Sequence, residues 1–284
     1  MFYNAKNKVI EIENTTANYI CFGRGNRNLI IIPGVGDVFK TVKGLAVPFS
    51  IMYKMFAKDF KVYVFSRRNV INEGFTTEDM ANDIINHMEM LNIDKADIVG
   101  VSQGGMIAQY IAINAPEKVN KLVLAVTTSR TNDILNKVVS DWIEKAKNKD
   151  YKGIMIDNAE KSYTGSYLEK NRKVYKLLGL LGKNVTYERF IIQAKSCLEH
   201  NAYDKIDNIK CPTLIIGAKQ DKVLGIVGSE ELAERIENSE LYIFDEYSHG
   251  VYEQAKDFNN RIFEYLKKKF ERMFLWQHLM ILWN

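Results

Sequence analysis

Short, continuous runs of apolar residues recur along the chain without the alternation that is typical of a strand with one face in water. Runs of this kind indicate strands buried on both faces of a mostly parallel sheet. Six segments show the pattern: 28–32, 61–65, 96–101, 121–126, 212–217 and 240–244. Residues 9–12 and 19–22 alternate instead, which predicts an antiparallel hairpin at one edge of the sheet.

Helical spacing of apolar residues fills the gaps between most of these segments. It is found in residues 77–91, 103–115 and 258–266. Strands that alternate with helices of this length are typical of a doubly wound α/β fold with a mostly parallel sheet. We therefore predict this fold class for the chain.

The alternation stops between residues 127 and 207. No strand pattern occurs there, and three helical segments replace it: 132–149, 167–181 and 186–200. We interpret residues 127–207 as a helical insertion between two late strands. The predicted core then comprises residues 1–126 and 208–272, which accounts for the length without a second independent domain.

Composition excludes several classes of function. Hydrophobic residues make up 46% and charged residues 26% of the chain, as in a folded globular protein rather than a disordered one. The net charge of +4 is too small to indicate nucleic-acid binding, and the basic run 267–269 is typical of a solvated helix face. No apolar run is long enough for a membrane span, and the N-terminus lacks the pattern of a signal peptide.

The cysteines and the C-terminal residues carry two further expectations. Cys21, Cys197 and Cys211 are far apart, which argues against a disulfide framework or a zinc site and favours a reducing, cytoplasmic location. We expect neither a metal nor another cofactor.

Residues 273–284 are unusually apolar and lie beyond the predicted core. A homodimer contact, docking on the chain's own surface and an artefact of the gene model remain open for this tail.

The strongest chemical signal is the G-x-S-x-G motif in residues 100–105. It lies where a predicted buried strand ends and a helix begins. A serine on so sharp a turn projects its hydroxyl group, and Gly100 and Gly104 remove side chains that would clash there. The start of the helix directs backbone N–H groups and the positive end of its dipole toward Ser102. We therefore predict that Ser102 is a nucleophile.

A serine nucleophile needs a base, and the chain has four histidines. His87 is expected on the surface of a helix, His200 at the end of another, and His278 lies in the tail. His249 follows the last predicted strand, at the sheet edge where the sites of α/β proteins assemble. We therefore predict that His249 is the base.

The base needs a carboxylate that orients it. Asp221 follows the strand at 212–217 and is expected at the same sheet edge. The chain order Ser102, Asp221, His249 matches one of the known orders of a catalytic triad. Asp133, just after an earlier strand, is the alternative acid, whereas Asp245 is too close in sequence to His249.

Taken together, these motifs resemble the α/β-hydrolase fold superfamily over about residues 20–270. The string at 100–109 is similar to the branch that holds serine esterases, enol-lactonases and cofactor-free haloperoxidases. Residues 65–69 with 75–81 resemble that branch's loop and helix after the third sheet strand. Residues 211–221 resemble its acid-bearing segment.

The resemblance implies an oxyanion hole and a cap. In the family the hole uses two backbone N–H groups, which fall here on Gln103 and, by position, on Val35. Many members have His-Gly in the loop that carries the second donor, where this chain has Pro33-Gly34. The insertion at 127–207 is similar to the family's cap, and its aromatic residues are candidates for lining the substrate pocket: Trp142, Tyr151, Tyr163, Tyr167, Tyr175 and Tyr187.

The function implied is that of a serine hydrolase acting on small carboxylic esters or thioesters through an acyl-enzyme. Its partner would be a small-molecule acyl substrate. Two alternatives remain open. The same triad can serve a cofactor-free haloperoxidase or a hydrolase of lactones or C–C bonds, and the fold can serve as a non-catalytic ligand-binding protein.

Overall fold

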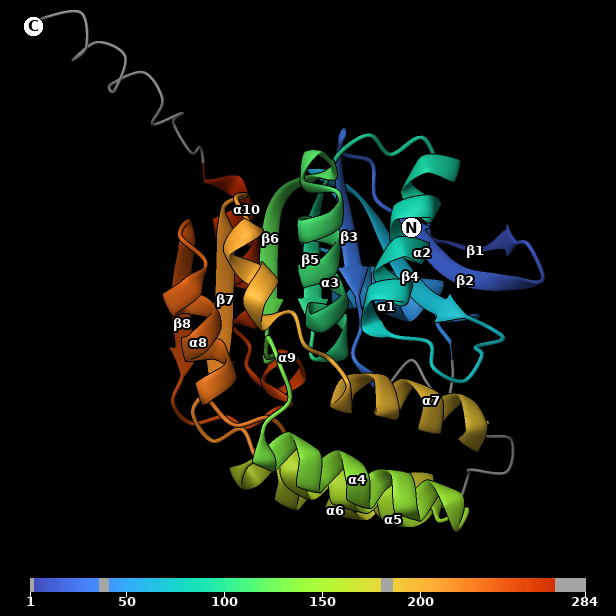
Figure 1. Cartoon of the computed structure of the whole chain (residues 1–284), viewed down its shortest axis with the longest axis vertical. Coiled ribbons are helices and arrows are strands. Elements are labelled where there is room, and N and C mark those ends of the chain that lie inside the picture. The colour runs from blue at the N-terminus through green and yellow to red at the C-terminus, as the bar shows by residue number, and fades with distance from the viewer. Residues whose placement is uncertain (1–2, 36–40, 180–185, 269–284) are drawn as a thin grey trace, which may run out of the picture.

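The computed structural model describes residues 3–35, 41–179 and 186–268. Its strands are β1 (Lys6–Ile12), β2 (Thr15–Phe22), β3 (Arg27–Ile32), β4 (Phe60–Arg68), β5 (Ala96–Val101), β6 (Val119–Ala125), β7 (Thr213–Ala218) and β8 (Ser239–Phe244). They form one eight-stranded sheet in the order β1-β2-β4-β3-β5-β6-β7-β8 (Figure 1). The pairs β1–β2 and β2–β4 are antiparallel and all the others are parallel. The predicted mostly parallel sheet with an edge hairpin is confirmed.

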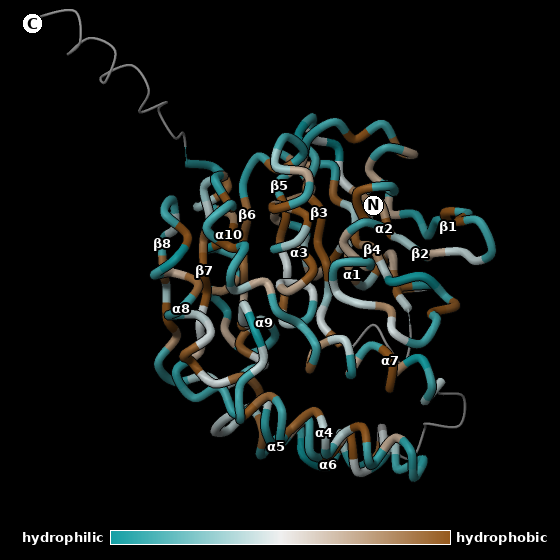
Figure 2. The backbone as a smooth tube through the Cα atoms, viewed as in Figure 1, coloured by the Kyte–Doolittle hydropathy of each residue, from teal (hydrophilic) through white to brown (hydrophobic). Residues whose placement is uncertain are grey.

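Helices cover both faces of the sheet. One face packs against α2 (Thr77–Met90), α3 (Gln103–Asn114) and α8 (Val227–Arg235). The other face packs against α1 (Ala46–Met52), α9 (Val251–Gln254) and α10 (Phe258–Lys267). Two short 3₁₀ helices, Pro116–Lys118 and Tyr203–Asn208, lie before β6 and β7. Figure 2 shows the hydrophobic backbone segments concentrated in the strands between the two helical layers.

The central strands explain why their sequences lack alternation. Every residue of β5 and of β7 is buried. In β3, Ile30 and Ile32 belong to the core cluster on one face, while Leu29 and Ile31 belong to the cluster on the other. Each fully buried aliphatic side chain of this kind contributes about 1.5–3 kcal/mol to stability. Both faces of these strands therefore need apolar residues.

Among the described residues, four α-helices lie between β6 and β7 and run along one end of the sheet (Figure 1). They are α4 (Asp133–Lys147), α5 (Tyr151–Ser162), α6 (Gly165–Leu178) and α7 (Tyr187–Leu198). The sequence pattern predicted α4, α6 and α7 but missed α5. Its apolar residues Ile154, Met155 and Ile156 are consecutive and so spread around the helix instead of recurring on one face, which leaves little apolar periodicity. Treating residues 127–207 as a separate cap unit remains a prediction.

The apolar tail and the possibility of a membrane span are the two remaining features. Residues 273–284 lie outside them, so the three interpretations of the tail, including the homodimer contact, stay untested. In the parts of the chain that the structure describes, every helix is too short or too polar to cross a bilayer.

Candidate active site

Ser102 lies in the tight turn between β5 and α3. Its φ of 55° and ψ of −121° place a residue with a side chain in a backbone region that is costly for any residue except glycine. Two contacts hold the turn: the Ser102 N–H donates to the Ala125 carbonyl at 2.9 Å, and the Thr127 hydroxyl donates to the Ser102 carbonyl at 2.8 Å. The sequence motif therefore forms the strained elbow that it predicted.

The two glycines of the motif lie where a side chain has no room. A Cβ atom on Gly104 would be 2.0 Å from the carbonyl oxygen of Ile32. A Cβ atom on Gly100 would be 2.4 Å from the carbonyl oxygen of Gly104. Close packing of β3, β5 and the start of α3 thus depends on both glycines.

The structure brings Ser102, His249 and Asp221 together from three separate strand ends. His249 Nε2 lies 3.0 Å from Ser102 Oγ, and His249 Nδ1 lies 2.8 Å from Asp221 Oδ2. The other Asp221 oxygen, Oδ1, accepts hydrogen bonds from the N–H groups of Val223 at 2.8 Å and Leu224 at 2.9 Å. Asp221 and His249 are both buried. The carboxylate is therefore held by both of its oxygens and can orient the imidazole.

The alternative acids do not take part in this arrangement. Asp133 is the first residue of α4 and is exposed. Asp245 is also exposed, and its carboxylate lies 3.4 Å from Lys219 Nζ. Across the described ranges, no group of three or more His, Cys, Asp and Glu side chains has an arrangement that could hold a metal ion.

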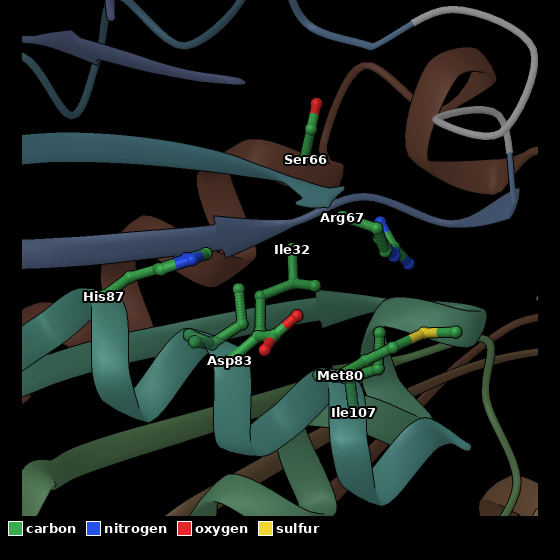
Figure 3. A pocket seen from close by; sticks show the side chains of 8 residues that line it. Ile32, Ser66, Arg67, Met80, Asp83, His87 and Ile107 are labelled. Carbon is green, nitrogen blue, oxygen red and sulfur yellow. The ribbon is translucent and has the colours of Figure 1, made fainter. Parts of the chain in front are cut away.

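His87 and His200 are both buried away from the triad, and His278 lies outside the described residues. The prediction that His87 is on a helix surface is wrong. Its side chain is 1% exposed, because it follows Ile84 by three residues and so lies on the face of α2 that packs against the sheet. It lines a small internal cavity together with Ser66, Arg67 and Asp83 (Figure 3). Burial lowers the pKa of His87 to about 4.

The two predicted oxyanion donors flank the elbow. Val35 lies in the loop after β3, and Gln103 begins α3 directly after Ser102. Among the described residues, neither backbone N–H donates a hydrogen bond to the protein. The neighbouring Gly34 is so close to the serine that a Cβ on it would be 3.1 Å from Ser102 Cβ. Val35 also lines the same cavity as Ser102, and the oxyanion role of Val35 and Gln103 stays a prediction.

Sequence reasoning missed a buried polar network behind these donors. Arg67 Nη2 donates to the Pro33 carbonyl at 2.6 Å and to Gln103 Oε1 at 2.9 Å. Gln103 Nε2 in turn donates to the Gln193 carbonyl on α7 at 2.8 Å. The network links the loop after β3, the start of α3 and helix α7. Arg67 lies in the stretch 65–69, which resembles the family, but nothing in the sequence indicates that α7 contacts the side chain of Gln103.

A cavity of about 350 Å³ opens onto the Ser102 hydroxyl and the His249 ring. Helices α4 to α7 supply much of its lining, and four of the six aromatic residues proposed from the insertion line it: Trp142, Tyr151, Tyr163 and Tyr175. Phe190, Tyr252 and Glu253 also line it. The site thus places Ser102 and His249 at a pocket that aromatic and aliphatic side chains line together.

Comparison with known proteins identifies the family. The family described as alpha/beta hydrolase fold matches residues 27–256. The chain belongs to the α/β hydrolase family. This α/β hydrolase is 22% identical to the 3-oxoadipate enol-lactonase 2 of Acinetobacter baylyi, over 90% of this chain and 95% of that protein. It is 24% identical to a 2-hydroxy-6-oxononadienedioate/2-hydroxy-6-oxononatrienedioate hydrolase of Burkholderia vietnamiensis, over 70% of this chain and 72% of that one.

A solved structure of the same fold covers nearly the whole chain. It is MGS-M2, an α/β hydrolase enzyme from a Medee basin deep-sea metagenome library, with a TM-score of 0.81 and 22% identity. The match covers 94% of this chain and 100% of that one. The family resemblance inferred from the motifs is confirmed, and the relatives named here are hydrolases.

Proposed function

We propose that this α/β hydrolase is a serine hydrolase that cleaves small carboxylic esters or thioesters through an acyl-enzyme. The observation that carries the proposal is the hydrogen-bonded series from Ser102 through His249 to Asp221, with contacts of 3.0 and 2.8 Å. A serine hydroxyl is a weak nucleophile until an adjacent base removes its proton, and this geometry supplies that base. The hydrolase relatives support the same class of reaction.

In the proposed reaction, His249 Nε2 takes the proton of Ser102 as the oxygen attacks the substrate carbonyl. Asp221 accepts the Nδ1–H of the ring, which selects the required tautomer and stabilises the imidazolium. His249 then gives the proton to the leaving alcohol or thiol. A water molecule, activated by the same histidine, hydrolyses the acyl-enzyme and restores Ser102.

The carbonyl oxygen becomes negatively charged during attack, and the proposed donors to it are the N–H groups of Val35 and Gln103. Removal of one such donor typically costs about 10²–10³ in rate. The Gln103 donor also lies at the N-terminus of α3, whose dipole favours negative charge there. Arg67 is proposed to hold both donor segments in place through its bonds to Pro33 and to the Gln103 side chain.

The cavity points to a small substrate. Its volume of about 350 Å³ is at the lower end of the range for small-molecule sites. Helices α4 to α7 would act as the cap that closes it, and their aromatic side chains would contact the apolar part of the acyl or alcohol group. We therefore expect short esters to be better substrates than long-chain lipids.

Turnover of 4-nitrophenyl acetate, butyrate and octanoate tests the proposal, with Ser102→Ala as the catalytic variant. Ser140→Ala, at an exposed position of α4, is the matched control. We expect the Ser102 variant to lower kcat by at least about 10³ while the control stays at the wild-type rate. Equal turnover by the wild type and the Ser102 variant would contradict the proposal and favour a non-catalytic ligand-binding protein.

A further inference from the structure

One charged side chain of the catalytic cavity has no part in the proposed reaction. Glu253 lies on α9, one helical turn after His249, and lines the same cavity as His249 and Ser102. The Tyr163 hydroxyl donates a hydrogen bond to Glu253 Oε2 at 2.5 Å. Within the ranges that the structure describes, no lysine or arginine forms an ion pair with this carboxyl group.

Glu253 is an exposed residue, although many protein atoms lie around its carboxyl group. Burial raises the pKa of Glu253, and its hydrogen bond with Tyr163 opposes that rise only in part. The side chain is one of those that line the cavity, so part of its surface can meet a ligand there. A carboxylate offers about four acceptor positions, and Tyr163 occupies one of them. The remaining positions are available to whatever fills the cavity.

Three tyrosines share the cavity lining with Glu253, and one of them, Tyr163, is bonded to it. Tyr163, Tyr175 and Tyr252 all line the cavity, and the rings of Tyr163 and Tyr175 stack with their centroids 5.3 Å apart. Burial raises the pKa of each of these phenols, and the negative charge of Glu253 raises it further. Tyrosine rings near a carboxylate can together attract an organic cation, through the negative charge and through whichever ring faces the ligand reaches.

We propose that Glu253 with Tyr163, Tyr175 and Tyr252 forms a subsite for a cationic group of the substrate, such as an organic ammonium. The enzyme would then prefer esters that carry an ammonium group over neutral esters of the same shape. The inference rests on the proposed function, because the subsite opens into the cavity that contains Ser102. A bound cation would form an ion pair with the Glu253 carboxylate, whereas a negatively charged ligand would be repelled by it.

Isosteric esters test the charge preference without a change of shape. Butyrylcholine and 3,3-dimethylbutyl butyrate differ only in a quaternary nitrogen in place of a carbon, on the alcohol side. The 4-nitrophenyl esters of 4-(trimethylammonio)butanoate and 5,5-dimethylhexanoate form the matching pair on the acyl side. We expect kcat/KM of the wild-type enzyme to favour the cationic member of at least one pair by about tenfold or more.

Glu253→Gln keeps the size of the side chain and removes its charge. We expect it to lower the ratio of kcat/KM for the cationic ester to kcat/KM for the neutral ester to about one. Glu246→Gln is the matched control, because Glu246 is exposed on the loop before His249 and does not line the cavity. The control should keep the full preference. A preference that survives in Glu253→Gln would overturn the assignment to this residue.

The ratio of kcat/KM between the cationic and the neutral ester is measured on the wild-type enzyme. It therefore tests the subsite even where a variant folds poorly. Hydrolysis of both neutral esters with a ratio near one in both pairs would overturn the subsite and leave the proposed function intact. Binding of butyrylcholine to the Ser102→Ala variant, measured by calorimetry, reports on the subsite without catalysis. Cation binding that is lost in Ser102→Ala/Glu253→Gln, without ester turnover by the wild type, would support the subsite and contradict the proposed function.

Discussion

Low pH should destabilise this α/β hydrolase because the folded protein resists protonation of His87. The loss begins near pH 6.5, above the pH at which most carboxylates titrate. The ring is buried against Phe65, with centroids 5.5 Å apart, and neither ring nitrogen has a hydrogen-bond partner within the described residues. Asp83 favours the protonated ring, but its carboxylate is already bonded to Arg68 Nε at 2.7 Å, and Arg68 opposes protonation. Burial dominates and lowers the pKa of His87 from 6.5 to about 4.

The size of the effect follows from this difference in pKa. Between pH 6.5 and 4, the unfolded chain binds a proton at His87 that the folded chain does not bind. The contribution of His87 is therefore complete above pH 6.5 and is lost as pH falls toward 4, for a total of about 3 kcal/mol. About 2 kcal/mol of this should be lost between pH 7 and pH 4.5. His200, whose pKa burial lowers to about 3, adds a second contribution of the same sign.

Urea unfolding of the wild type and of His87→Met at several pH values between 7 and 4.5 measures the effect. Methionine is flexible enough to fill the site and does not titrate. The free energy of unfolding of the variant should fall by about 2 kcal/mol less than that of the wild type over this range. Parallel curves for the two proteins would refute the reasoning, because the buried ring would then have no part in the acid lability.

Two further predictions concern the triad and its elbow. Gly104→Ala should strongly lower the yield of folded protein, measured by soluble expression and thermal unfolding, since its Cβ would lie 2.0 Å from the Ile32 carbonyl oxygen. Asp221→Asn should keep the fold by circular dichroism but lower kcat on 4-nitrophenyl butyrate by about 10⁴, because an amide opposite His249 Nδ1 favours the wrong tautomer. A wild-type rate in Asp221→Asn would remove Asp221 from the proposed mechanism.

Much of the fold could be predicted from the sequence because its strands are buried on both faces. Continuous apolar segments such as 96–101 indicate buried strands. The edge hairpin is indicated by the alternation of apolar and polar residues. Helix α5 could not be found in this way, since its apolar residues do not recur on one face of the helix. His87 could have been placed by its spacing from Ile84, which indicates the inward face of α2.

The candidate triad could be located because strand ends of a parallel sheet meet at one edge. Ser102, Asp221 and His249 each follow a strand, so the sequence was enough to predict that they lie close together, as their hydrogen bonds show. Glu253 could not be assigned in the same way. Its place in the cavity lining follows from the packing of Tyr163, directly after α5, and of helices α4 to α7 over the end of the sheet. Packing of this kind leaves no local pattern in the sequence.

The account rests on Ser102 as the nucleophile, and covalent labelling tests this most directly. A fluorophosphonate probe reacts with an activated serine whatever the natural substrate is, and peptide mapping by mass spectrometry locates the modified residue. We predict one modification per chain, on Ser102, that requires His249 and disappears in Ser102→Ala. Failure of the folded wild type to react, or a label on another residue, would contradict the central claim.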